Sequence, residues 1–585
     1  MKTIHKILVP NRGEIAIRIF RACHEMGIRT VAVYSKEDVL SLHRSRADEA
    51  YLVGKGKKPV DAYLDIEDII RICKEHDVDA IHPGYGFLSE NAQLARRCEE
   101  EGIIFIGPKV EHLQMFGDKV NARIQAEKAE IPMIPGTNGA VKDFAEVKAF
   151  AERVGLPVMI KAINGGGGRG MRRVDRMEDL KESYEEARSE AKRAFGDEDV
   201  YVEKCILNPK HIEVQIMGDE HGNVIHLNER DCSIQRRHQK VIEMAPAWSL
   251  PKKLRQNICA AALKIMKNVR YVNAGTVEFL ADQDEEHFYF IEVNPRVQVE
   301  HTVTEAITDV DIVKTQILVA EGYALSDPKI GIKSQEDIPC NGVAIQCRIT
   351  TEDPQNNFMP DTGKINDYRS GGGPGIRLDA GTAYTGAVIT PYYDSLLVKV
   401  TAHANNAKET ISRMLRCLDE FRIGGVKTNI YFLKNMLLDK NFQEGTCNVN
   451  YIDHHPELLD DPHVIDEPAA GLLAYIGEVT VNGFHGNGAN PKPRFETPVK
   501  LDASDEECPS GTRQLLQELG SEKFAKWIQD QKQVLLMDTT YRDAHQSLLA
   551  TRIRTQDIMK AIHYTACRVP QIYAFEDWGG ATFDV

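Results

Sequence analysis

The stretch Ile291-Glu292-Val293-Asn294-Pro295-Arg296-Val297-Gln298-Val299-Glu300-His301 alternates apolar and polar residues. Successive side chains of a β-strand point to opposite faces, so an extended conformation would turn the polar side chains before His301 to one side. That side would carry two carboxylates, two amides and a guanidinium. An exposed charged face is the simplest interpretation, because such residues are rarely buried; a binding site is the alternative.

An apolar run at residues 275–280 precedes this stretch and is expected to pair with it. The acidic residues 282–286 between them suit a hairpin turn, which would bring Glu278 close to Glu292 and Asn294. Carboxylates placed this closely repel one another unless a cation lies among them, and Mg²⁺ usually binds through one or two carboxylates plus substrate phosphates. The pattern therefore favours a magnesium site.

The bulk composition narrows the class of protein. A chain of 585 residues has material for three or four domains, since single cores stop growing near ~250–300 residues. Its 42% hydrophobic and 27% charged composition is typical of a globular protein, and the net charge of −15 argues against general nucleic-acid binding. The sequence shows neither a secretory signal nor a membrane span. Twelve scattered cysteines without a Cys-x-x-Cys pair predict reduced thiols and a cytoplasmic location.

Strands and helices alternate in the first part of the chain. Buried strands are expected at residues 6–10, 30–34, 80–83 and 103–108, with helices at 14–26 and 66–75. This order predicts a doubly wound α/β unit with a parallel sheet. The first loop, Asn11-Arg12-Gly13-Glu14, is not Gly-x-Gly-x-x-Gly, so a dinucleotide cofactor is unsupported. The loop at 82–90 follows a strand, where such sheets bind ligands, although a plain turn fits equally well.

A glycine-rich loop at residues 164–171 follows a strand at 158–162. Glycine lets backbone N–H groups approach an anion closely, and Lys161 stands just before the loop. The spacing is not that of a P-loop. The loop therefore predicts a mobile phosphate-covering hairpin rather than a passive linker, followed by a helix at 177–195 and a strand at 200–204.

Residues 229–240 carry four basic side chains and a histidine in an acidic protein. A solvated face is possible, but an anion-binding segment facing the carboxylates explains the charge better. Together with residues 10–16, 82–91, 161–171 and 292–301, this segment resembles the biotin carboxylase branch of the ATP-grasp enzymes. One departure is Asn164, at a position where many relatives carry another glycine.

The resemblance implies a three-part ATP-grasp fold. Residues 1–118 would form an N-terminal α/β subdomain, 119–205 the ATP-grasp region with its lid, and 206–453 the C-terminal subdomain. By the same resemblance, ATP would be bound by Lys119, Lys161, Gly167, Gly168, Glu203, Lys204, Ile206, His211, Gln235 and His238. Glu278, Glu292 and Asn294 would hold Mg²⁺ or Mn²⁺. Phosphoryl transfer depends on positioning and on neutralising negative charge, which these residues supply.

The resemblance also implies the route of the reaction. Bicarbonate would lie against Arg296, Gln298 and the N–H of Val299, with Glu300 as its base. Attack on the γ-phosphate of ATP would give carboxyphosphate, which breaks down to CO₂ and phosphate. This phosphate, held by Lys240, would deprotonate biotin, and Arg348 would stabilise the biotin enolate.

Weaker candidates surround the expected biotin site. They are Tyr85, Gly372, Gly373, Tyr393 and Asp394, and ordinary turn or packing roles fit them equally well.

The last part of the chain changes in composition. Residues 454–531 are expected to be a linker and part of a small allosteric or tetramerisation domain, with an amphipathic helix at 512–531. A strand at 534–538, a helix at 555–566 and a strand at 572–580 predict one β/α/β unit, and polar residues 539–547 follow its first strand. Barrel enzymes keep their chemistry at such strand ends.

This β/α/β unit, at residues 532–585, resembles the start of the carboxyltransferase barrel of the pyruvate carboxylase family. The resemblance implies that Asp543 binds a divalent metal and that Arg542 and Gln546 contact substrate or biotin. A (β/α)8 barrel needs ~200–250 residues, so we expect an incomplete barrel and a chain that is a piece of a longer enzyme.

The expected function is biotin-dependent carboxylation, with ATP, bicarbonate and a biotinylated carrier domain as partners and with pyruvate giving oxaloacetate in the complete enzyme. The family suggests dimeric biotin carboxylase units within a homotetramer, and acetyl-CoA or another nucleotide is a possible effector. One alternative is the biotin carboxylase of an acyl-CoA carboxylase, against which residues 539–547 argue. Another is a non-catalytic nucleotide sensor, which the presence of Glu300, Arg296, Lys240 and Arg348 disfavours.

Overall fold

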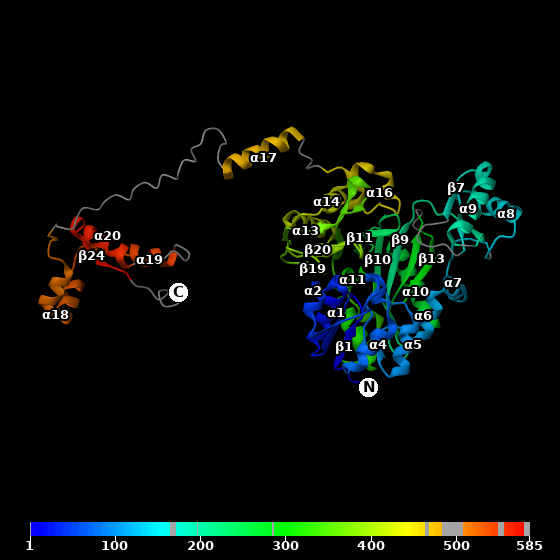
Figure 1. Ribbon diagram of the computed structural model, residues 1–585, viewed down its shortest axis with the longest axis horizontal. Helices are drawn as coiled ribbons and strands as arrows, with labels where there is room; N and C mark the ends of the chain where they lie inside the picture. The colour runs from blue at the N-terminus through cyan, green and yellow to red at the C-terminus, as the bar shows by residue number, and fades with distance from the viewer. Residues whose placement is uncertain are drawn as a thin grey trace. The chain divides into compact units, whose positions relative to one another are not determined.

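The computed structural model describes residues 2–137, 139–163, 171–195, 197–282, 286–461, 467–482, 507–547 and 555–577. The chain divides into two compact units, Met1–Val464 and Ile465–Val585, and both mix helices and strands (Figure 1). In the described part, no helix has the length and apolar character needed to cross a membrane.

A five-stranded parallel sheet begins the first unit, as predicted. Its strands are β1 (Lys6–Val9), β2 (Arg29–Tyr34), β3 (Glu49–Leu52), β4 (Ala80–Ile81) and β5 (Ile104–Phe105), in the order β3-β2-β1-β4-β5. The accompanying helices are α1 (Gly13–Glu25), α2 (Leu42–Arg46), α3 (Pro59–Tyr63), α4 (Ile66–Glu75), α5 (Ala92–Glu101) and α6 (Val110–Gly117).

The strand order of this sheet reverses between β1 and β4. Parallel sheets bind ligands at such a point, beyond the carboxyl ends of the strands. The loops that follow these two strands are joined there, because Asn11 Nδ2 donates to the carbonyl oxygens of Pro83 and Tyr85, each 2.8 Å away. The switch point thus fixes both loops as one wall of a site.

A small lobe follows, cyan in Figure 1. It consists of α7 (Lys119–Lys128), α8 (Phe144–Val154), α9 (Leu180–Phe195) and the antiparallel sheet β7-β6-β8, with β6 at Val158–Ala162, β7 at Met171–Val174 and β8 at Val200–Lys204. The predicted glycine-rich loop joins β6 to β7. Residues 164–170 lie outside the described residues, and Gly167 and Gly168 with them.

An eight-stranded antiparallel sheet forms the centre of the first unit, in the order β13-β12-β9-β10-β11-β14-β21-β19. The strands are β9 (Lys210–Gly218), β10 (Val224–Arg236), β11 (Gln239–Ala245), β12 (Asn273–Ala281), β13 (Phe288–Asn294), β14 (Val343–Thr350), β19 (Ile376–Ala380) and β21 (Leu396–Ala404). The helices α10 (Lys252–Asn268), α11 (His301–Thr308), α12 (Ile312–Glu321) and α13 (Ala407–Glu420) pack on it.

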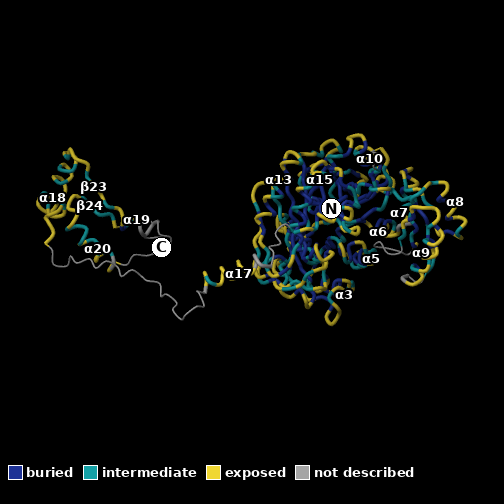
Figure 2. The backbone as a smooth tube through the Cα atoms, turned by 90° about the horizontal axis from the view of Figure 1, so that it is seen from above, coloured by how far each residue is buried: buried dark blue, intermediate teal, exposed yellow. Residues whose placement is uncertain are grey.

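Shorter elements complete the first unit. They are β15 (Glu352–Asp353), β16 (Met359–Pro360), β17 (Gly363–Lys364), β18 (Asp367–Arg369), β20 (Val388–Ile389), β22 (Arg422–Gly424), α14 (Ile430–Leu438), α15 (Lys440–Glu444) and α16 (Tyr451–His454). Buried residues, dark blue in Figure 2, concentrate in the interior of this unit.

The stretch from Ile291 to His301 is only partly a strand. β13 ends at Asn294, residues 295–300 form a loop and turn, and α11 starts at His301, so the prediction of one continuous strand is wrong. Proline lacks the N–H that a ladder needs, and Pro295 therefore ends the pairing. The predicted hairpin is confirmed, because Glu278 pairs with Glu292 and Thr276 with Asn294.

The second unit contains α17 (Glu467–Asn482), α18 (Thr512–Gln529), α19 (Thr540–Ser547), α20 (Thr555–Arg568) and the parallel pair β23 (Leu536–Asp538) and β24 (Ile572–Phe575). The parallel pair agrees with the predicted β/α/β unit. The helix expected at 512–531 breaks at Gly520, where φ is 72° and ψ is 166°.

Two of the cysteines also differ from expectation. Cys508 and Cys567 form a disulfide, with Cα atoms 4.5 Å apart, whereas the other ten cysteines are free. The prediction of reduced thiols is therefore wrong for this pair, which the fold brings together across a separation of 59 residues.

Candidate active site

Lys240 on β11 lies at the centre of a cluster of buried carboxylates. Its Nζ is 2.6 Å from Glu213 Oε2, 2.7 Å from Glu300 Oε1 and 3.0 Å from Glu278 Oε1. Burial lowers the pKa of Lys240, but the three carboxylates outweigh burial and raise that pKa well above its ordinary value. The ammonium is therefore charged at neutral pH.

The carboxylates around Lys240 are also charged. Burial raises the pKa of Glu213, but Arg230 and Lys240 outweigh it and lower that pKa to about 2. Burial likewise raises the pKa of Glu300, against which Lys240 and Arg348 act, and the net shift is downward. Both groups are ionised at neutral pH, as a proton acceptor has to be.

Arg230 on β10 is fully buried and fills its hydrogen-bonding capacity. Nε donates to Glu213 at 2.6 Å. The two terminal nitrogens donate to four further side chains, namely Gln215, Thr304, Thr276 and Gln298, at 2.7–3.2 Å. The five N–H groups of a guanidinium thus have five acceptors. The amide of Gln298 is oriented by this contact, so that its Nε2 donates to Glu278 at 2.9 Å.

Arg348 on β14 also contacts Glu300. Its Nη2 is 3.1 Å from Glu300 Oε2, and its Nε donates to the fully buried Glu243 at 2.5 Å. Burial raises the pKa of Glu243 and Arg348 lowers it, with a net upward shift. The guanidinium therefore joins Glu300 to a second carboxylate in the sheet.

The residues expected to hold a cation gather on β12 and β13. Glu278 accepts from Asn294 Nδ2 at 3.0 Å, and Glu292 is its partner across the hairpin. Nε2 of His211 lies 3.0 Å from Glu278 Oε2. The hairpin thus places two carboxylates and an amide side by side, and the neighbouring strand β9 adds the imidazole of His211.

Carboxylates outnumber cationic side chains in the buried part of the cluster. Its described ion pairs join four buried carboxylates, Glu213, Glu243, Glu278 and Glu300, to one ammonium and two guanidinium groups, those of Lys240, Arg230 and Arg348. A surplus of negative charge in a buried cluster favours a bound cation.

Arg296 lies at the edge of this cluster, in the loop after β13. Its Nε is 2.5 Å from Glu90 Oε1, and its Nη2 donates to Asn294 Oδ1 at 3.0 Å. Glu90 belongs to the loop that follows β4. The guanidinium therefore spans the N-terminal sheet and the central sheet, and is about one-fifth exposed.

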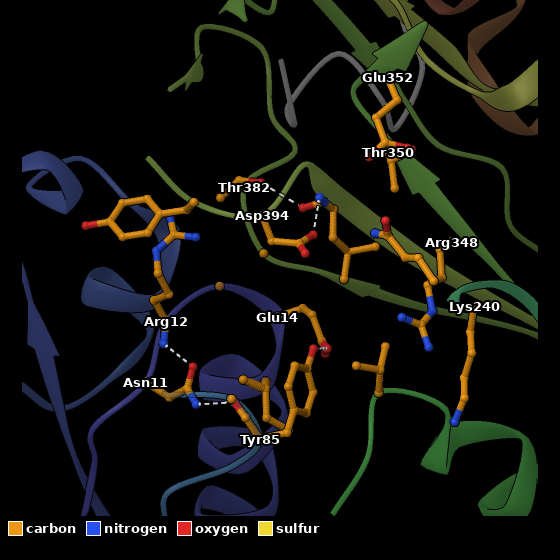
Figure 3. Close-up of a pocket in the computed structure, with 18 of the residues that line it drawn as sticks. Asn11, Arg12, Glu14, Tyr85, Lys240, Arg348, Thr350, Glu352, Thr382 and Asp394 are labelled. Carbon is orange, nitrogen blue, oxygen red and sulfur yellow. Dashed lines mark hydrogen bonds between the residues drawn. The ribbon is translucent and has the colours of Figure 1, made fainter. Parts of the chain in front are cut away.

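A cavity of about 550 Å³ opens beside these residues and is lined by both sheets. Figure 3 shows Lys240 and Arg348 pointing into it from the central sheet, with Glu14 and Tyr85 on the N-terminal side. Arg12 stacks on Tyr393, with its guanidinium carbon 3.9 Å from the ring centroid. The cavity thus has cationic side chains on both sides and aromatic rings near one of them, which suits a flat, partly polar ligand.

The structure brings Tyr85, Tyr393 and Asp394 to this cavity, as expected for a biotin site. It does not bring the glycine pair there. The N–H of Gly372 donates to Glu420 on α13, and neither Gly372 nor Gly373 is among the described residues that line the cavity.

The expected ATP residues form two groups. In the lobe, Lys161 Nζ is 2.6 Å from Glu203 Oε2, and burial lowers the pKa of Lys161 while Glu203 raises it, with a net upward shift. On the central sheet, Gln235 Nε2 and His211 Nδ1 are 2.8 Å apart.

The remaining expected ATP-binding residues lie apart from these two groups, or their side chains are not among the described residues. Nζ of Lys204 donates to the carbonyls of Gly155 and Leu156, at 3.1 and 3.0 Å, which is a structural contact. Ile206 is half-buried, and His238 is exposed at the turn between β10 and β11. Lys119 starts α7, but its side chain lies outside the described residues.

In the second unit, the expected carboxyltransferase residues lie in α19, which follows β23. Nε of Arg542 is 2.6 Å from Glu576 Oε2, and the Asp543 side chain is about half exposed. The side chain of Gln546 lies outside the described residues.

Sequence patterns missed two residues of the cluster. Glu213 and Glu243 are fully buried charges that contact the expected site, whereas the buried Arg230 belongs to the basic segment at 229–240 that was predicted to face the carboxylates. A signal for Glu213 was present, because His211, Glu213 and Gln215 alternate with apolar residues in the same way as 292–300. Nothing comparable marks Glu243, whose role depends on its neighbour on β14.

Comparisons with known proteins agree over the whole chain. Three family descriptions match: "Biotin carboxylase, N-terminal domain" at residues 3–113, "Carbamoyl-phosphate synthase L chain, ATP binding domain" at 118–328 and "Biotin carboxylase C-terminal domain" at 346–454. Pyruvate carboxylase of Bacillus subtilis is 62% identical over 100% of this chain and 51% of its own length. Human mitochondrial pyruvate carboxylase is 52% identical over 100% and 49%. The chain spans about half the length of these curated relatives.

Solved structures give the same result. The biotin carboxylase domain dimer of Hydrogenobacter thermophilus 2-oxoglutarate carboxylase, in complex with MgADP, ADP and bicarbonate, is 47% identical with a TM-score of 0.73, over 79% of this chain and 99% of that one. Pyruvate carboxylase of Rhizobium etli with the allosteric activator acetyl coenzyme A is 51% identical with a TM-score of 0.75, over 100% of this chain and 52% of that one.

Proposed function

This chain belongs to the biotin carboxylase family, and we propose that its first unit carboxylates biotin with ATP and bicarbonate as the other substrates. One observation carries the proposal. Lys240 and Arg348 converge on Glu300, at 2.7 and 3.1 Å, beside a cavity that both sheets line. This arrangement offers an ionised base and two cations at the place where an anion would enter.

Each of the three predicted parts has its own role in the proposed reaction. Residues 1–118 contribute the cavity wall at Glu14 and Tyr85, residues 119–205 form the ATP-grasp region and lid, and residues 206–453 supply the charged cluster. Lys161, with Lys119, Gly167 and Gly168, binds the phosphates of ATP. The backbone near Glu203, Lys204 and Ile206 takes the adenine, and His211, Gln235 and His238 surround the ribose and phosphates.

Glu278 and Glu292 hold Mg²⁺ or Mn²⁺, with Asn294 beside them. The excess negative charge of the cluster supports this role, and a divalent cation supplies neutralisation of the phosphate oxygens. Glu278 has its amide neighbours Asn294 and Gln298 in place at 3.0 and 2.9 Å. Those contacts orient the carboxylate before the cation binds.

Bicarbonate lies against Arg296, Gln298 and the N–H of Val299, and Glu300 removes its proton. The resulting carbonate attacks the γ-phosphate of ATP and displaces ADP to give carboxyphosphate, which breaks down to CO₂ and phosphate. The phosphate, held by Lys240, then takes the proton of the biotin ring nitrogen. Arg348 stabilises the enolate so formed until its ring nitrogen adds to CO₂, and Tyr85 and Asp394 border the biotin site.

The complete protein is a pyruvate carboxylase that transfers the carboxyl group from biotin to pyruvate and forms oxaloacetate. The similarity to pyruvate carboxylases through the second unit supports this. There Asp543 binds a divalent metal, and Arg542 and Gln546 contact substrate or biotin. Biotin arrives on a carrier domain. The subunits form biotin carboxylase dimers within a homotetramer, acetyl-CoA acts as effector, and the enzyme is cytoplasmic.

The decisive test is ATP hydrolysis by this chain with bicarbonate and free biotin. We expect turnover that depends on both, and Glu300→Gln should lower it by about 100-fold or more, the usual contribution of a general base. ATP affinity, measured with a fluorescent nucleotide, should stay within about twofold because Glu300 is assigned to bicarbonate.

Glu130→Gln is the matched control, because Glu130 pairs with Lys264 on the surface and its side chain is 84% exposed. It should turn over like the unchanged chain. Nucleotide binding without turnover in the unchanged chain would instead support a sensor. Equal loss of turnover and ATP affinity in Glu300→Gln would mean that the base is misassigned.

A further inference from the structure

Val299 stands between two peptide groups that are held by buried side chains. Nδ1 of His301 lies 2.7 Å from the carbonyl oxygen of Gln298. Nζ of Lys399 donates to the carbonyl oxygen of Val299 at 2.8 Å. Among the described residues, the N–H of Val299 itself donates to no protein acceptor, and Val299 lines the cavity. The free N–H therefore belongs to a peptide segment whose orientation is fixed.

Lys399 is an unusual residue to find on β21. Its side chain is fully buried, and lysine is almost never fully buried unless it is paired. The partner is Glu14, whose Oε1 is 2.9 Å from Nζ and also accepts from the Tyr85 hydroxyl. The ammonium lies 5.9 Å from the centroid of the Tyr85 ring. One buried lysine thus joins the cavity wall of the N-terminal sheet to the loop that carries Val299.

His301 is fully buried at the start of α11. A carbonyl oxygen can only accept, so Nδ1 carries the ring proton when it contacts Gln298. Burial lowers the pKa of His301 to about 3, which keeps the ring neutral at neutral pH. The ring therefore acts as a fixed neutral donor.

The geometry of a peptide group links these contacts to the N–H of Val299. The carbonyl of Gln298 and the N–H of Val299 belong to one planar trans unit and point in opposite directions. A donor inside the protein that holds the Gln298 carbonyl therefore turns the N–H of Val299 to the opposite side, away from that donor. Lys399 holds the next peptide group in the same way, so the segment cannot rotate about Val299.

We propose that Lys399 and His301 are positioning residues that fix the Val299 N–H for bicarbonate. This rests on the proposed function, in which that N–H binds bicarbonate. Neither residue touches the reacting atoms. Their effect should therefore appear in the affinity for bicarbonate and leave the affinity for ATP unchanged.

The test compares Lys399→Met and Lys6→Met in the whole chain, by the KM for bicarbonate and the KM for ATP in the biotin-dependent ATP hydrolysis assay. Lys6 is the matched control. Its Nζ also contacts one carbonyl oxygen, of His76 at 2.8 Å, and one carboxylate, of Glu49 at 3.0 Å. It lies on β1, away from the cavity residues.

We expect Lys399→Met to raise the KM for bicarbonate about tenfold, which corresponds to the loss of one well-placed hydrogen bond. The KM for ATP should stay within about twofold, and Lys6→Met should change neither. His301→Phe should raise the KM for bicarbonate in the same direction. The double variant Lys399→Met/Glu14→Gln leaves no unpaired buried charge, so it should keep the raised KM while recovering stability.

The outcomes separate the two hypotheses. No turnover in the unchanged chain would refute the proposed function before Lys399 is considered. Turnover in the unchanged chain with an unaltered KM for bicarbonate in Lys399→Met would overturn the positioning role. Parallel increases in both KM values, or recovery of the bicarbonate KM in the double variant, would show a general structural role instead and would also overturn it.

Discussion

Removing the guanidinium of Arg230 should destabilise the first unit more than any surface charge does. Arg230 is fully buried and donates to Glu213, Gln215, Gln298, Thr276 and Thr304. In Arg230→Met, the stem is replaced by an apolar chain and all five acceptors lose a donor. Of the two cations that contact Glu213, only Lys240 then remains to balance its negative charge.

The size of the effect follows from these contacts. Breaking a buried ion pair by removing one partner costs about 3–5 kcal/mol. Each buried acceptor left without a donor costs about 1–3 kcal/mol, although the two threonine hydroxyls can turn to other partners. These costs are not additive, so we take about 3 kcal/mol, the lower end for the ion pair alone, as the lower bound. With a urea slope of about 3 kcal/mol/M, the unfolding midpoint should fall by about 1 M or more.

The assay is urea unfolding of the chain, monitored by a spectroscopic signal that reports the unfolding of the first unit. Arg71→Met is the control, because Arg71 pairs with Asp68 and Glu75 on the surface and its side chain is 51% exposed. Exposed pairs contribute up to about 1 kcal/mol, so its midpoint should move by about 0.3 M or less. Equal shifts in the two variants would refute the idea that Arg230 organises the cluster.

Two further predictions concern the N-terminal subdomain and the glycines near it. Burial lowers the pKa of His43 to about 4. Between about pH 6.5 and 4, the His43 ring is therefore neutral in the folded chain but binds a proton in the unfolded chain. Stability should fall as pH drops from about 6.5 to 4, and His43→Leu should reduce this slope by up to about 1.4 kcal/mol per pH unit in urea unfolding; an unchanged slope would contradict it. A Cβ at Gly381 would lie 2.2 Å from the backbone N of Glu14, whereas one at Gly372 meets nothing within 4 Å. Gly381→Ala should therefore cost about 1–3 kcal/mol in thermal unfolding and Gly372→Ala much less, and the reverse order would refute it.

Local patterns in the sequence were sufficient for much of the fold. Alternation at 211–216 and the strand–helix order at the start of the chain predicted β9 and the parallel sheet correctly. The alternation at 291–301 failed after Asn294, because a period of two does not distinguish a strand from a loop that leads into a helix. Pro295 was the local signal that the strand had to end.

The cluster around Lys240 depends on strand order, which local patterns do not contain. Glu213 on β9 and Arg348 on β14 reach Lys240 and Glu300 because β9, β10, β11 and β14 are neighbours in the sheet. Register then decides which side chains meet, as in the pairing of Glu243 with Gln346 across β11 and β14. Long-range pairing of this kind follows from the packing of the whole unit.

The lowered pKa of Glu300 is compatible with its proposed role as a base. Burial raises this pKa, but Lys240, Arg348 and Arg230 outweigh burial, so the carboxylate is ionised and weakly basic. A bicarbonate bound beside Arg296 and Lys240, as proposed, would also lose its proton more easily, because the same cations stabilise the carbonate that forms. In the proposed reaction the cations would therefore acidify the donor, and the proton transfer would need no strong base.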